Sequence, residues 1–88
     1  MRTHDSIIRT TSAVDSETGL ATIIAEDHRG NRLVVPRKEL STTWSDEVYE
    51  EAARRFWNTF HPGRTVTVIH TRVWESGTAF SVFVEAPR

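Results

Sequence analysis

One short run places two carboxylates and an imidazole next to one another, Glu26-Asp27-His28. Such groups bind metal ions and transfer protons, so this run is the first candidate for chemistry. It lies between two β-rich segments, where a turn is expected, and the side chains of consecutive turn residues diverge. A metal site would need a second histidine, His70 or His4, brought close to His28 by the fold. We therefore expect a solvated turn here, with no metal ligands.

Other catalytic patterns do not appear in the sequence. The chain has no cysteine, so a disulfide, a thiolate metal site and a cysteine nucleophile are all excluded. No serine lies in a Gly-x-Ser-x-Gly elbow, and no serine, histidine and carboxylate set can be inferred from spacing. The four glycines stand singly in separate turns, so no phosphate-cradling loop is formed. The sequence predicts a protein that is not an enzyme, with no catalytic residues and no cofactor.

The better functional lead is the last hairpin, residues 65–86. A two-residue or four-residue loop at its turn, residues 75–78, would set Val73 opposite Phe80. Period-2 alternation then gives the hairpin one core face, which includes Phe80, and one mixed face. The mixed face supplies the predicted partner-binding residues, which are aromatic or cationic: His70, Arg72, Trp74 and Phe83.

Aromatic and cationic side chains of this kind are enriched at the centres of protein interfaces. Two alternatives stay open. Trp74 could fold over its own turn while Phe83 and Val68 form a minor core beneath the N-terminal strand. The same aromatic and arginine face could instead stack on single-stranded nucleic acid. A net charge of −1 and the scattering of cations along the chain weigh against nucleic acid.

Three β-rich runs, residues 7–14, 20–26 and 32–35, come before the helix and the last hairpin. Turn-forming residues separate them, which predicts two successive hairpins. The register of the second of these is left open, because three loops around Gly30 would put different residues inward. Pro36 lacks a backbone donor, so the third strand ends there or runs along an edge.

One helix should begin after the N-cap Ser45 and run to about Phe60. Its apolar stripe recurs every three or four positions: Val48, Tyr49, Ala52, Ala53, Phe56 and Phe60. Trp57 is placed at the margin of that stripe. On the exposed side, two acid-first pairs at i, i+4 spacing should form, Glu50 with Arg54 and Glu51 with Arg55.

The element order βββαββ predicts an α+β fold, an antiparallel sheet of about five strands with one helix packed across one face. Residues 1–88 should form a single small domain with an ordered core of about 6–86. The sheet face opposite the helix then lacks a cover, and the mixed face of the last hairpin would lie there.

We therefore expect a non-enzymatic protein-binding module, an inhibitor, adaptor or assembly subunit, that uses this open sheet face. Such compact proteins are common among phage and mobile-element accessory proteins that block a host machine. The expected partner is a larger protein or a second copy of the chain, and no small-molecule substrate is evident. No apolar run approaches the roughly 20 residues of a membrane span, and the first residues lack a signal-peptide pattern. A cytoplasmic location is the default expectation.

Overall fold

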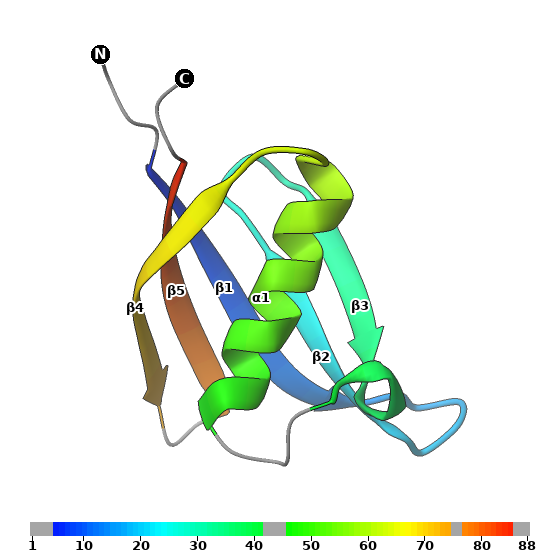
Figure 1. The fold of residues 1–88 in the computed structure, drawn as a ribbon. Coiled ribbons are helices and arrows are strands. Elements are labelled where there is room, and N and C mark those ends of the chain that lie inside the picture. The colour runs from blue at the N-terminus through cyan, green and yellow to red at the C-terminus, as the bar shows by residue number, and fades with distance from the viewer. Residues whose placement is uncertain (1–4, 42–45, 75–76, 86–88) are drawn as a thin grey trace.

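The computed structural model describes residues 5–41, 46–74 and 77–85, and the side chains of residues 5, 46 and 68–74 lie outside this description. The described residues form five strands and one α-helix in the order βββαββ (Figure 1). The strands are β1 (Asp5–Val14), β2 (Ala21–Glu26), β3 (Arg32–Pro36), β4 (Val66–Trp74) and β5 (Thr78–Glu85). Helix α1 spans Asp46–Phe60, and a 3-10 helix, η1 (Arg37–Glu39), follows β3. The predicted elements are present in the predicted order.

The sheet is antiparallel throughout, with the strand order β3-β2-β1-β5-β4. The N-terminal strand β1 is therefore central, between β2 and β5, while β3 and β4 form the edges. Pro36 ends the edge strand β3, where the missing N–H costs no bond to a further strand. Helix α1 crosses one face of this sheet (Figure 1), so the α+β prediction is confirmed.

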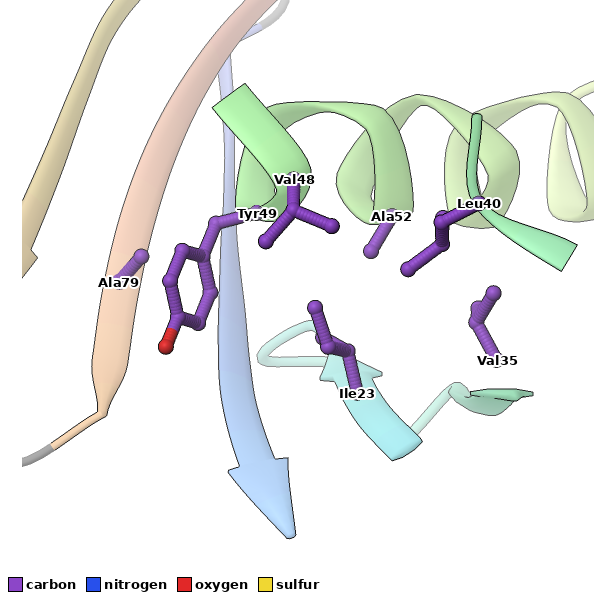
Figure 2. Packing of buried hydrophobic residues seen from close by; sticks show 7 residues of the cluster. All are labelled: Ile23, Val35, Leu40, Val48, Tyr49, Ala52 and Ala79. Carbon is purple, nitrogen blue, oxygen red and sulfur yellow. The ribbon is translucent and has the colours of Figure 1, made fainter. Parts of the chain in front are cut away.

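The first half of the helix packs on the sheet through a cluster of buried side chains. Val48, Tyr49 and Ala52 extend from α1 toward Ile23 and Ala79 on the strands (Figure 2). Tyr49 is 6% exposed, and the other four side chains are fully buried. Burial of this apolar surface holds the helix across the central strands.

The second half of the helix has its own cluster of buried residues: Ile8, Ala25, Ala53, Phe56, Trp57 and Phe83. Trp57 was expected at the margin of the apolar stripe, but it is only 2% exposed and belongs to this core. Its indole Nε1 donates a hydrogen bond to the Arg64 carbonyl oxygen at 3.2 Å. This bond satisfies the polar atom that burial would otherwise leave unpaired.

The predicted helix boundaries are confirmed, since α1 begins at Asp46 and ends at Phe60. The proposed N-cap Ser45 lies outside the described residues. Of the two expected ion pairs on the exposed side of α1, that between Glu50 and Arg54 forms, with Nε and Oε2 3.6 Å apart.

The second expected pair, Glu51 with Arg55, is replaced by contacts to the segment that follows β3. Arg55 Nη2 lies 2.9 Å from Glu39 Oε1, and the Glu51 carboxylate accepts hydrogen bonds from Ser41 at 2.9 Å (backbone N–H) and 3.0 Å (hydroxyl). These side chains therefore tie the chain after β3 to the helix, a contact that helical spacing alone does not reveal.

The predicted register of the last hairpin is wrong by one residue between the loop and His70, and by two residues beyond the register shift between Val68 and His70. Trp74 pairs with Thr78 and Val73 pairs with Ala79, so three residues lie in the loop. The third of them, Gly77, has a φ of 84°. A left-handed glycine at this position is characteristic of three-residue hairpin loops. The prediction of a two-residue or four-residue loop was therefore wrong.

A one-residue shift exchanges the two faces of a strand. Phe83, expected on the uncovered face, is fully buried beneath the helix, whereas Phe80, expected in the core, is 39% exposed. The β2–β3 hairpin also differs from the registers left open, because Glu26 pairs with Arg32 and its five-residue loop is centred on Arg29.

Candidate functional site

No described element covers the sheet face opposite α1 (Figure 1). Three large apolar side chains of three different strands remain exposed there: Ile7 at 54%, Val34 at 48% and Phe80 at 39%. We define the open face by nine described residues that the sheet register places on it: Ile7, Arg9, Thr11, Ile24, Glu26, Arg32, Val34, Phe80 and Val82. Exposed apolar side chains gathered on one face are characteristic of binding surfaces.

An ion pair lies in the middle of the open face. Arg9 pairs with Glu26 of β2 and with Phe80 of β5 in the register, so these three residues form one row across the central strands. Arg9 Nη2 is 3.1 Å from Glu26 Oε1, with side chains 52% and 34% exposed. An exposed pair of this kind adds at most about 1 kcal/mol to stability. Its clearer effect is to orient a guanidinium group next to an exposed aromatic ring.

A pocket of about 530 Å³ opens on this row. Its lining residues are Ile7, Arg9, Glu26, Asp27, His28 and Phe80. The two apolar side chains, Ile7 and Phe80, are thus flanked by groups of both charge signs. Binding pockets commonly combine an apolar lining with a few polar groups that fix the orientation of the bound group.

The β2–β3 turn that borders the pocket is fixed by Asp27. Its carboxylate accepts hydrogen bonds from the backbone N–H groups of Arg29 at 2.9 Å and Asn31 at 3.0 Å, and from Asn31 Nδ2 at 3.0 Å. Partial burial acts to raise the pKa of Asp27, but these hydrogen bonds, together with the charge of His28, lower it overall. The carboxylate is therefore engaged in holding the turn.

The three residues of the run Glu26-Asp27-His28 have different roles in the structure. Glu26 pairs with Arg9, Asp27 holds the turn, and His28 is exposed at the pocket. Within residues 5–41, 46–74 and 77–85, no three histidine or acidic side chains come together as a metal site would require.

Of the four residues predicted to bind a partner, Phe83 does not lie on the open face, so this part of the prediction is wrong. Its ring is fully buried, with its centroid 5.8 Å from that of Trp57, so it belongs to the core. The side chains of the other three lie outside the described part of the chain. The register pairs the backbone of these three with residues of β5: His70 with Val82, Arg72 with Phe80, and Trp74 with Thr78. Their role in binding stays a prediction.

Ile7, Arg9 and Glu26 were not identified from the sequence. They come from segments that meet only because β1 lies between β2 and β5. The run around Ile7 and Ile8 has an isoleucine on each face, so alternation gives no signal of which face is exposed. The one available signal was Gly77, since a glycine in the last loop position points to a three-residue loop and so to an exposed Phe80.

Comparisons with known proteins give no functional assignment. No family model matches the chain, and neither a curated protein nor a solved structure matches it. Among the described helices, none is long and apolar enough to cross a membrane.

Proposed function

We propose that this chain is a small non-enzymatic protein-binding module, an inhibitor, adaptor or assembly subunit, that uses the open face of its sheet. The observation that supports this proposal is the exposed pair Ile7 and Phe80, which lines a pocket of about 530 Å³ beside an oriented guanidinium group. An apolar or aromatic side chain of a partner can enter such a pocket, and Arg9 and Glu26 can pair with polar groups at its edge. Anchors of this kind supply most of the binding energy in protein interfaces.

The area of the open face, compared with the area that a stable complex buries, indicates how much of the face a partner must cover. Five strands spaced by about 4.8 Å, each presenting some six residues at about 3.3 Å, give roughly 500 Å² in projection. A stable protein complex usually buries about 800 Å² of accessible surface on each side. A partner must therefore cover most of the face, from β3 to β5, and a short peptide seated only in the pocket would bind weakly.

The described residues of the open face give little support to nucleic-acid binding. Strong binding to phosphates needs several converging cations. The described open face presents two arginines, Arg9 and Arg32, and Arg9 is paired with Glu26. Phe83, one of the two predicted stacking residues, is buried. We therefore favour a protein partner.

The proposal is tested by affinity capture from lysate of the cells that naturally make the protein, after nuclease treatment. Phe80→Glu places a charge in the centre of the open face and should abolish recovery of a specific partner. Leu20→Glu is the matched control, since Leu20 is 55% exposed at the opposite end of β2 from the pocket and the charge change is the same.

Thermal unfolding must show that both variants remain folded. A folded Phe80→Glu variant that recovers the same partner in the same amount as wild type would refute the proposed site. If nuclease removed all bound material, single-stranded nucleic acid would replace protein as the proposed partner.

A further inference from the structure

A second pocket lies on the helix side of the sheet, at the end where α1 terminates (upper end of Figure 1). Its volume is about 210 Å³, and its lining residues are Ser6, Arg29, Trp57, His61, Arg64 and Glu85. It brings together the start of β1, the β2–β3 turn, the end of α1 and the end of β5. None of its lining residues belongs to the open face, so it is independent of the proposed protein interface.

Two arginines, Arg29 and Arg64, line this pocket, and the guanidinium group of Arg64 is held by an ion pair. Arg64 Nε lies 3.0 Å from Glu85 Oε1, and Glu85 is itself only 12% exposed. Because this contact uses Nε, the two terminal nitrogens of Arg64 remain as donors. Arg29 extends from the turn that Asp27 fixes, and its guanidinium has no hydrogen bond or ion pair to any described residue.

Trp57 supports the wall of the pocket next to Arg64. The His61 ring packs on the Trp57 indole with centroids 4.3 Å apart, and the His61 backbone N–H donates to the Trp57 carbonyl oxygen at 2.7 Å. The same indole donates to the Arg64 carbonyl oxygen. A histidine ring carries at least one N–H in either charge state, so His61 adds a further donor.

Ser6 provides a hydroxyl that lines the same pocket. The residue is 9% exposed, and its hydroxyl makes no hydrogen bond to any described residue. No fully buried side-chain oxygen or nitrogen among the described residues lacks a partner, so this hydroxyl keeps some accessible surface at the pocket. It can donate a hydrogen bond to a bound anion and so adds a neutral donor to those of the arginines.

We propose that this pocket binds a phosphate group carried as a monoester. The lining contains two arginines and one glutamate, so the pocket is locally cationic in a chain of net charge −1. The planar donor set of arginine matches the oxygen geometry of phosphate. The volume is several times the roughly 30 Å³ share of a water molecule, which leaves room for the tetrahedral group and the first atoms of its carrier.

The test is an NMR titration of the isotope-labelled protein with inorganic phosphate, O-phosphoserine and serine, at constant ionic strength set by chloride. Inorganic phosphate and O-phosphoserine should cause saturable shifts of the Trp57 indole and of the His61 and Arg64 amides, while serine should cause none. Tighter binding of O-phosphoserine than of inorganic phosphate would support a carried phosphate. Equal binding would overturn the monoester and leave a site for the free anion.

Arg29→Gln is the decisive variant, because the Arg29 side chain supports no described contact and its loss should not affect folding. It should weaken O-phosphoserine binding by at least about tenfold, and so should Arg64→Gln. Arg9→Gln removes the same charge from the open face and should leave the affinity unchanged. Absence of saturable shifts in the wild type, or an equal loss for Arg9→Gln and Arg29→Gln, would overturn the proposal.

Discussion

Phe80 and Phe83 lie three residues apart in β5 and on opposite faces of the sheet: Phe83 is fully buried against Trp57, and Phe80 is 39% exposed beside Arg9. The pair defines which face is core and which is open. Both the assignment of the core and the proposed binding surface depend on it.

The first prediction compares alanine substitutions of these two phenylalanines. Phe83→Ala should lower the free energy of unfolding by about 3–5 kcal/mol, because it leaves a cavity under the helix. Phe80→Ala should change it by less than about 1 kcal/mol, because the ring is partly exposed and no helix covers it. Chemical denaturation of the two variants measures the difference. Equal losses would contradict the placement of Phe80 and Phe83 on opposite faces of the sheet.

The second prediction concerns the loop glycine that sets this register. Gly77 and Gly19 both have positive φ, 84° and 71°, but only at Gly77 would a Cβ meet a neighbour, the Ser12 hydroxyl. Ser12 donates to the Gly77 carbonyl oxygen through both its backbone N–H, at 2.8 Å, and its hydroxyl, at 3.2 Å.

Both alanine variants carry the cost of a left-handed residue, roughly 1–2 kcal/mol. Gly77→Ala should be less stable than Gly19→Ala by a further 1 kcal/mol or so, because the hydrogen bonds of Ser12 are disturbed. Thermal unfolding of the two variants side by side provides the measurement. A Gly19→Ala variant that is the less stable of the two would contradict this reading of the β4–β5 loop.

The third prediction concerns the pH dependence of stability at the β2–β3 turn. The pKa of Asp27 is lower in the folded protein than its ordinary value. The ionised carboxylate therefore stabilises the fold at pH values above the pKa of the unfolded chain, and this contribution is lost as the pH falls through the lowered folded-state pKa.

The Tm of wild type should exceed that of Asp27→Asn by the largest amount near neutral pH. This Tm difference should become smaller as the pH falls to about 2. Thermal unfolding at a series of pH values measures it. A difference that is constant, or that grows toward acid pH, would show that the hydrogen bonds to Asp27 do not favour its ionised form.

Much of the fold could be predicted because local patterns determine it. The helix follows from apolar spacing and from the break at Pro62, and both are local. The number and direction of the strands follow from β-rich runs joined by short turns. Strand order was not predicted, because the position of β1 between β2 and β5 depends on packing between distant segments.

The candidate site was predicted less well than the fold, for a specific reason. The side-chain period of a strand is two residues, so a single error in loop length moved Phe83 into the expected site and Phe80 out of it. Ile7, Arg9 and Glu26 could not be selected without knowing that β1 is central. The sequence also gave no sign of the pocket at the end of α1, since its residues come from β1, the β2–β3 turn, α1 with the turn that follows it, and β5.

Contact between a protein partner and the open face is tested most directly by site-specific photo-crosslinking. Phe80 is replaced by a photo-crosslinking phenylalanine analogue, and Leu20 is replaced in a matched control. Irradiation in lysate of the natural source should join one defined protein, or a second copy of the chain, to the analogue at position 80 and not at position 20. Crosslinking of the same partner only at position 20, or of none at position 80 while wild type still captures a partner, would contradict the proposed interface.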